Sequence, residues 1–273
     1  MVHPRATAAD PTADAEVAVR AASAGAAVAR ARYATGSRRT ADRGLDFTTE
    51  ADVETERAIR DVLAELRPGD AIVGEELGSS GDGRRRWLVD PICGTLNFAA
   101  GVPLFAVNVA LDVDDVTAAA AVADPAAGDV FWTDGAAAWH RPETTAPDTG
   151  VDRRLQPTSS SRLVTVNLES SYPDDSGIRL LSDEVFRARF SPRFLSTTLA
   201  LAWVATGQQA GYVTAGDLRG SVHWTAGIAL CRAAGAVVTN LAGGELHTGH
   251  HGLIAAADAG THAFLLDRLH AGG

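Results

Sequence analysis

The sequence predicts an α/β protein in which helices and short strands alternate along the chain. Segments with the helical spacing of apolar residues are separated by short apolar runs of strand length. The composition is globular, with 273 residues of which 46% are hydrophobic and 21% charged. No internal repeat or heptad pattern runs along the chain, which excludes repeat arrays and coiled coils.

The first half of the chain predicts two helices followed by a group of strands. Residues 13–34 are rich in alanine, and residues 50–66 carry apolar side chains at helical spacing until Pro68 and Gly69 end the segment. Ser79–Arg86 predicts an exposed turn, and Pro91 is expected to open a loop. Short apolar runs predict strands at 71–74, 87–90, 105–113, 116–123 and 130–133.

The second half begins with a polar segment that indicates a subdomain boundary. Residues 141–162 are rich in Pro, Thr, Ser and Asp and have no periodicity. We therefore expect a tail at 1–14, an N-terminal α+β subdomain at 15–145 and a C-terminal α/β subdomain at 146–273. Beyond the boundary the patterns predict helices at 177–189, 197–206, 222–234 and 261–270, and strands at 163–168, 236–239 and 253–256.

Charge and cysteine usage narrow the possible functions. Thirty-four acidic residues against 24 basic ones give a net charge of −10, which disfavours nucleic acid as a partner. All the basic residues are arginine, so lysine-based catalysis is excluded. The two cysteines form no disulfide framework and suit a reducing compartment. No apolar stretch reaches the ~18 residues of a membrane span. We expect a cytoplasmic protein that does not enter a membrane.

The strongest local motif runs from Asp90 to Phe98, with the sequence Asp-Pro-Ile-Cys-Gly-Thr-Leu-Asn-Phe. An aspartate that leaves a strand into a Gly/Pro turn projects its carboxylate over the end of a sheet, a common position for a ligand site. Glu75 ends the preceding strand, so both carboxylates can converge on one hard cation. Without further information, an aspartate that only caps the next turn is the alternative.

Several motifs in order resemble the inositol-monophosphatase-like family of Mg²⁺-dependent small-molecule phosphatases. The resemblance runs from about residue 15 to the C-terminus. It rests on Asp46–Asp52 (DFTTEAD), Gly74–Glu76 (GEE), Trp87–Phe98 (WLVDPICGTLNF), Val204–Gly207 (VATG), Trp224–Gly227 (WTAG) and Gly243–Gly244. The resemblance implies a layered α-β-α-β-α sandwich, a homodimer and a small, phosphorylated substrate.

Two positions depart from the family pattern. Cys93 and Thr225 stand where the family has metal-binding aspartates. Glu75, Asp90 and the Ile92 carbonyl match the ligands of the first metal, and the resemblance assigns Asp52 and Thr95 to positioning water or to further metal-site groups. Mg²⁺ requires hard oxygen ligands, so we expect one weakly bound Mg²⁺ and loss of the second site.

Cys93 and His223 each have a structural and a catalytic interpretation. Cys93 either fills the space of a lost aspartate or acts as a nucleophile or acid, which requires a lowered pKa. A site for a soft metal is less favoured because no second cysteine or paired histidine lies in the motifs. His223 is either exposed before a helix or faces the emptied second-metal region as a proton donor.

Other residues lie near the expected substrate pocket. The resemblance places Gly94, Thr95, Ser196, Thr197 and Thr225 there, and Ser196 replaces a family glycine after Arg193. Arg84–Arg86 is interpreted as a solvated turn beside the site that could receive an anion. Three histidines, His247, His250 and His251, are interpreted as part of a solvated loop.

Three functions are compatible with this pattern. The favoured one is an enzyme repurposed for non-hydrolytic chemistry on a small metabolite, such as elimination, cyclisation or isomerisation. The first alternative is a weak one-metal phosphomonoesterase acting on inositol or sugar phosphates. The second is a catalytically silent metabolite-binding protein. Retention of Glu75, Asp90, Thr95 and Asp52 argues against silence, whereas the changes at 93 and 225 argue against ordinary hydrolysis.

Overall fold

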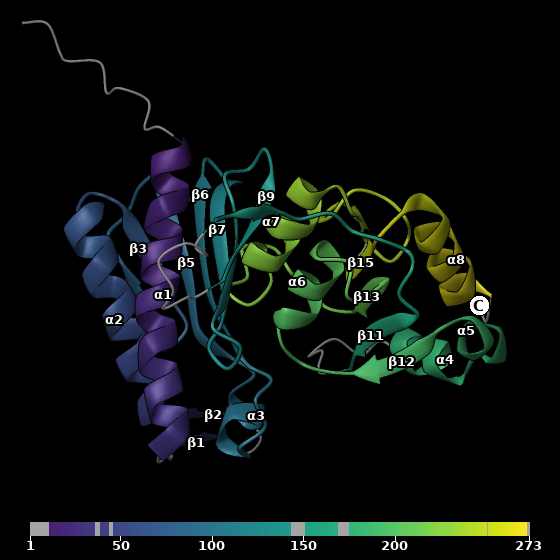
Figure 1. Cartoon of the computed structure of the whole chain (residues 1–273), viewed down its shortest axis with the longest axis horizontal. Helices are drawn as coiled ribbons and strands as arrows, with labels where there is room; N and C mark the ends of the chain where they lie inside the picture. Colours follow the sequence, from purple (N-terminus) through teal and green to yellow (C-terminus); the bar gives the residue numbers. More distant parts are fainter. Residues whose placement is uncertain are drawn as a thin grey trace, which may run out of the picture.

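Two β-sheets and three layers of helices stack in the order α-β-α-β-α, which confirms the predicted fold class (Figure 1). This computed structural model describes residues 11–35, 39–43, 46–142, 151–168, 175–249 and 251–271. The expected boundary at 145/146 and most of the expected tail lie outside the described residues. The division into two subdomains stays a prediction, and β10 (Arg153–Arg154) joins the first sheet from beyond that boundary.

The first sheet has eight strands in the order β10-β9-β8-β7-β6-β5-β3-β4. Only β3 and β5 are parallel neighbours; the other pairs are antiparallel. Its remaining strands are β3 (Ala71–Gly74), β4 (Ser79–Ser80), β5 (Arg85–Cys93), β6 (Ala106–Val113), β7 (Val116–Asp124), β8 (Asp129–Thr133) and β9 (Ala138–Pro142). Strands β6 and β7 are buried over most of their length, as expected for a sheet that has helices on both faces.

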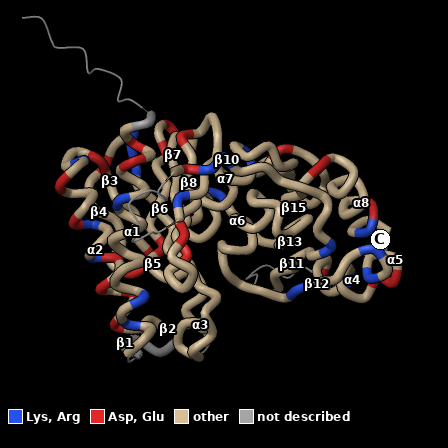
Figure 2. Tube along the Cα trace, in the orientation of Figure 1, with Lys and Arg blue, Asp and Glu red and all other residues tan. Residues whose placement is uncertain are grey.

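The outer face of this sheet is covered by α1 (Pro11–Thr35) and α2 (Glu50–Leu66). Buried alanines, among them Ala15, Ala18 and Ala22, let α1 lie close to the strands. Figure 2 shows acidic residues and arginines interspersed along both helices. Strands β1 (Arg39–Arg43) and β2 (Asp46–Thr49) form a separate pair that leads into α2. No helix in the described ranges is long and apolar enough to cross a membrane.

The central layer consists of α6 (Leu199–Ala205) and α7 (Thr225–Ala234), which lie between the two sheets. The second sheet has the order β12-β11-β13-β15-β14. Its strands are β11 (Leu163–Asn167), β12 (Ser191–Phe194), β13 (Gly211–Thr214), β14 (Val237–Thr239) and β15 (Leu253–Ala256). Its outer face carries α4 (Ser176–Ser182), α5 (Glu184–Arg189) and α8 (Ala259–His270). A short helix, α3 (Thr95–Ala99), follows β5.

Three local predictions were wrong. Strand β5 does not end before Pro91 but continues to Cys93, because a register shift between Asp90 and Cys93 lets the strand accommodate a residue without an N–H. The single helix expected at 177–189 is two helices, since Asp183 caps α5 by accepting a hydrogen bond from the Phe186 N–H at 2.6 Å. Ser79–Arg86 contains β4 and the start of β5.

The three arginines at 84–86 do not form an anion site beside the candidate ligands. Arg84 pairs with Asp114, and Arg86 lies 2.5 Å from Asp115. Both aspartates occupy the two-residue turn between β6 and β7, with φ of 53° and 64°, a turn that suits the twist of a hairpin. Arg85 pairs with carboxylates as well, and the whole group lies at the opposite end of β5 from Asp90.

Candidate functional site

Asp90 lies at the centre of the candidate site, where β5 passes between the outer helices and the central layer. Its side chain is fully buried. The His223 Nδ1–H donates to Asp90 Oδ2 at 2.8 Å, and Asn108, the register partner of Asp90 on β6, lies 3.4 Å from the same oxygen. Asp90 Oδ1 has no hydrogen-bond partner among the described residues. One carboxylate oxygen is therefore occupied and the other is available.

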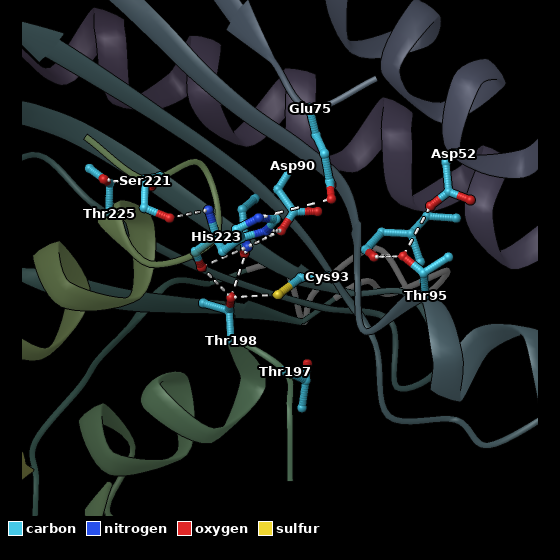
Figure 3. A network of polar contacts seen from close by, with 12 residues as sticks. Asp52, Glu75, Asp90, Cys93, Thr95, Thr197, Thr198, Ser221, His223 and Thr225 are labelled. Atoms are coloured by element: carbon cyan, nitrogen blue, oxygen red, sulfur yellow. Dashed lines mark hydrogen bonds and ion pairs between the residues drawn. The ribbon is translucent and has the colours of Figure 1, made fainter. Parts of the chain in front are cut away.

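Glu75 follows β3 and approaches the same region, as the sequence predicted for two converging carboxylates (Figure 3). Its Oε1 lies 3.9 Å from His223 Nε2. Burial and the nearby charge of Asp90 raise the pKa of Glu75 well above its usual range. A cation placed between the two carboxylates relieves this repulsion.

The turn that carries Glu75 is held by a buried carboxylate on α2. Glu56 Oε2 accepts a hydrogen bond from the Glu76 N–H at 2.7 Å, and the Leu77 N–H lies 3.3 Å from both Glu56 oxygens. Arg60 Nε donates to Glu56 at 2.7 Å. Gly74 lies against this carboxylate, and a Cβ there would approach Glu56 Oε1 to 1.9 Å. The Gly-Glu-Glu motif therefore requires glycine at its first position, because the Glu56 carboxylate fills the space that any larger side chain would need.

Asp52 and Thr95 meet at the other side of the site. Asp52 lies in the first turn of α2 and accepts a hydrogen bond from the Thr49 N–H at 2.8 Å. Thr95 Oγ1 lies 3.4 Å from Asp52 Oδ1 and 3.0 Å from the Ile92 carbonyl oxygen. Burial raises the pKa of Asp52 to about 6. The structure thus brings Asp52 and Thr95, which the resemblance assigned to one role, beside the carbonyl of Ile92, which it assigned to the first metal.

Cys93 is buried beside Asp90, with 8% of the residue exposed. Its Sγ lies 3.0 Å from Thr198 Oγ1. Burial, followed by the charge of Asp90, raises the pKa of the thiol to about 11. A thiol protonated at neutral pH is a poor nucleophile, so this environment does not favour the nucleophile interpretation of Cys93.

His223 enters the site from the loop before α7. Its side chain is 43% exposed, so the ring closes one side of the site and remains open to solvent. Burial opposes protonation, but Asp90, then Cys93 and Glu75, raise the pKa of His223 to about 12. The ring lies against Asp90 and toward Glu75 and is not turned wholly to solvent (Figure 3).

Thr225, at the other altered position, does not contribute to the cluster. Its hydroxyl donates to the Ser221 carbonyl oxygen at 2.7 Å, one turn earlier. The Thr198 hydroxyl donates to the His223 carbonyl oxygen at 2.6 Å, and Asn108 Nδ2 donates to Thr198 Oγ1 at 2.8 Å. Asn108 and Thr198 were missed by sequence reasoning; the only signal was a lone asparagine within the apolar run of β6.

The other predicted residues divide into two groups. Gly94 has φ of +108°, and a Cβ there would lie 2.9 Å from the Leu104 carbonyl oxygen and 3.3 Å from that of Ser196, which places the segment 196–197 beside the Asp90–Phe98 motif. His247 and His251 lie in a separate pocket with Asp217, Arg219 and Gly249, and His250 lies outside the described residues.

The donor set fits one hard cation and does not fit two. Glu75, Asp90 and the Ile92 carbonyl offer oxygen ligands, and the partnerless buried Oδ1 of Asp90 is the atom that a bound cation would satisfy. The second position offers a neutral hydroxyl turned to Ser221 and a buried thiol, and neither is a good ligand for Mg²⁺.

Comparison with known proteins identifies the family. The model of the inositol monophosphatase family matches residues 10–272. The chain is 44% identical over 110 residues to the inositol-1-monophosphatase SuhB of Mycobacterium tuberculosis, a match that spans 38% of each chain. It is 34% identical over 237 residues to a histidinol-phosphatase of the same species, covering 84% of this chain and 86% of that protein.

Solved structures give the same result for the fold. The extragenic suppressor protein suhB of Bartonella henselae superposes with a TM-score of 0.81 at 24% identity, over 94% of this chain and 98% of that one. The layered sheets, the ordered motifs and the family-wide match agree. The chain belongs to the inositol monophosphatase family.

Proposed function

We propose that the chain is an enzyme that carries out non-hydrolytic chemistry on a small, phosphorylated metabolite. Members of its family are phosphatases, and the resemblance matches Asp52, Glu75, Asp90 and Thr95 to functional positions of the family. One observation carries the proposal: the His223 Nδ1–H holds the Asp90 oxygen, at 2.8 Å, in the region where a second Mg²⁺ would need ligands. An imidazole has replaced the ion that hydrolysis by two metals requires.

The family is generally Mg²⁺-dependent, and the site fits a single ion. Glu75, Asp90 and the Ile92 carbonyl would hold it, with Asp90 Oδ1 as the free oxygen. When bound, such an ion supplies positive charge that polarises a phosphate or hydroxyl oxygen. The loss of a second Mg²⁺ site is supported by the neutral groups at 93 and 225.

The chain's own residues supply an acid and a base. Asp90 orients the His223 ring through Nδ1, so that Nε2 faces Glu75 across 3.9 Å. In an elimination, a carboxylate that does not hold the ion takes a proton from carbon while the imidazole N–H protonates the departing oxygen. The C–H and C–O bonds break, a C=C bond forms, and no oxidant is needed. Isomerisation uses the same pair of proton transfers.

One-metal phosphate hydrolysis is the second candidate, favoured by the retained Asp52–Thr95 pair. Thr95 Oγ1 lies within 3.4 Å of Asp52, an arrangement that can orient a water molecule. Its weakness is the absence, among the described residues of the site, of a second carboxylate pair to hold the ion that would stabilise the leaving oxygen.

The test combines an isotope with a double variant. Wild-type protein with Mg²⁺ is incubated with inositol and sugar phosphates in ¹⁸O-labelled water. We expect wild-type products that contain no ¹⁸O in phosphate, because C–O cleavage or rearrangement takes no oxygen from water into phosphate. Efficient release of labelled phosphate would overturn the proposal in favour of hydrolysis. Ligand binding without any product would favour the silent interpretation.

The double variant Cys93→Asp/Thr225→Asp should gain Mg²⁺-dependent release of labelled phosphate and lose the wild-type reaction. Each single variant should recover little, because the second ion needs both carboxylates together with Asp90 and effects within one site are not additive. Adding His223→Ala to the double variant should raise hydrolysis further, since the imidazole then no longer holds Asp90. Cys231→Ser, at the other buried cysteine, is the control and should leave product formation unchanged.

We also propose a cytoplasmic homodimer. The family resemblance implies the dimer, and two buried cysteines that form no disulfide suit a reducing compartment. Light scattering at micromolar concentration should give twice the 28.3 kDa chain mass, and a monomer would contradict this part of the proposal.

A further inference from the structure

Three side chains of different chemistry converge beside β5. Asp90, Cys93 and His223 each present one possible ligand atom, and the carboxylate oxygen, the thiol sulfur and a ring nitrogen all lie within 4.8 Å of one another. Asp90 and Cys93 are buried and His223 is part-buried. His223 is 130 residues from Cys93 in the sequence, so the fold alone assembles the set.

The ligand types in this cluster select a borderline metal and reject Mg²⁺. Zn²⁺ binds cysteine sulfur at about 2.3 Å, histidine nitrogen at about 2.0–2.1 Å and carboxylate oxygen at about 2.0–2.2 Å. Ligands at these distances around a tetrahedral centre lie roughly 3.3–3.6 Å apart, which atoms already within 4.8 Å reach by small side-chain rotations. Three protein ligands leave a fourth position for water or substrate, as in catalytic zinc sites.

The buried oxygen that the Mg²⁺ site would use is also open to this cation, so the two ions would compete for Asp90. Asp90 Oδ1 is fully buried and has no hydrogen-bond partner in the described part of the chain. Leaving such an oxygen unsatisfied is unfavourable, and more so when it is charged. Thr198 and Asn108 hold Cys93 and the His223 backbone around this oxygen, while the exposed side of the His223 ring gives an ion a route of entry.

We propose that Asp90, Cys93 and His223 form a binding site for a borderline-soft divalent cation of the Zn²⁺ class. On binding, the Cys93 S–H bond breaks, the sulfur–metal bond forms and the proton is released to solvent; the coordinating ring nitrogen gives up its proton in the same way. The proposal goes beyond the proposed function and does not require it.

Co²⁺ is the probe, because it replaces Zn²⁺ and is coloured. Full-length protein without an affinity tag is stripped of metal and titrated with Co²⁺. We expect one equivalent to bind, with visible bands of four-coordinate intensity and a near-ultraviolet band from charge transfer between thiolate and cobalt. Zn²⁺ should abolish both signals, whereas Mg²⁺ at millimolar concentration should not.

Matched variants locate the site. Cys93→Ser should lose the charge-transfer band and His223→Gln should lose the visible bands, with circular dichroism confirming that both variants fold. Cys231→Ser and His140→Gln should keep all bands; Cys231 is an equally buried thiol, and His140 pairs with Asp129 at 2.7 Å outside the cluster. Absence of the band in wild type, its survival in Cys93→Ser or its loss in Cys231→Ser would each overturn the proposal.

The two experiments test the cation site and the proposed reaction separately. Co²⁺ absorption reports binding in the absence of substrate, whereas the ¹⁸O experiment reports the bond that is cleaved with Mg²⁺ alone. A silent metal titration with unlabelled product would remove the cation site and leave the reaction class in place.

Discussion

Gly74→Ala tests how the fold positions Glu75. A Cβ at residue 74 would lie 1.9 Å from Glu56 Oε1, 2.4 Å from its Cδ and 2.7 Å from Arg60 Nη2. The Glu56 side chain is fully buried and Arg60 is 15% exposed, so the carboxylate cannot swing into solvent. It must instead give up hydrogen bonds to the Glu76 and Leu77 N–H groups.

The cost follows from those lost bonds. A hydrogen bond to a charged group contributes about 1.5–3 kcal/mol, and partial relaxation recovers some of the loss. Losing one to two such bonds predicts a destabilisation of about 2–4 kcal/mol, a large share of the ~5–15 kcal/mol that stabilises a typical protein. For a chain of this size, the expected fall in Tm is about 5–12 °C.

Urea denaturation followed by tryptophan fluorescence measures this change, with Gly69→Ala as the matched control because nothing lies within 4 Å of a Cβ at that position. A double-mutant cycle with Glu56→Ala sharpens the test. If the methyl group acts by displacing Glu56, the two substitutions together should cost less than the sum of their separate effects. The reasoning is refuted if Gly74→Ala matches Gly69→Ala within about 0.5 kcal/mol, or if the cycle is additive.

Two further predictions concern metal binding and pH. Isothermal titration should show at most one Mg²⁺ per chain, bound weakly and lost in Glu75→Gln; two ions sharing Asp90 in a Mg²⁺-soaked crystal would contradict it. Asp258 caps α8 and accepts a hydrogen bond from the Thr261 N–H at 2.7 Å, and hydrogen bonds from Ser159 and Thr261 lower its pKa. A lowered folded-state pKa means that this stabilisation is present above about pH 4 and lost as pH falls through the folded value. Asp258→Ala should therefore cost about 1 kcal/mol in urea denaturation at pH 6, and an equal cost at pH 2 would count against the assignment.

Much of the layered fold could be predicted from local patterns, and the exceptions have physical causes. Helix α2 has apolar residues at helical spacing with charged residues between them, and a proline follows its end. The predicted bounds, 50–66, therefore agree with those of the helix. Strands β12 and β13 were missed because neither has an apolar run: β12 has the sequence Ser-Pro-Arg-Phe, and β13, Gly-Tyr-Val-Thr, has only two apolar residues. Pro91 misled the prediction for β5, because the register shift that tolerates it is a property of strand pairing.

The parts of the candidate site that come from a single segment of the chain were predictable. Thr95, Ile92 and Asp90 lie within six residues, so their proximity follows from a single turn. Asn108 and Thr198 come from β6 and from the start of α6, and only the stacking of three layers places them around Asp90. No local pattern encodes such a contact.

His223 is the residue that allows the buried Asp90 to remain charged. With Thr225 turned to the Ser221 carbonyl and a neutral thiol at Cys93, Asp90 would be a buried carboxylate without a counter-charge, which is strongly unfavourable. His223 supplies that counter-charge at 2.8 Å. The charge on Asp90 therefore depends on His223 and not on the side chains at 93 and 225, which are neutral and, in the case of Thr225, turned away.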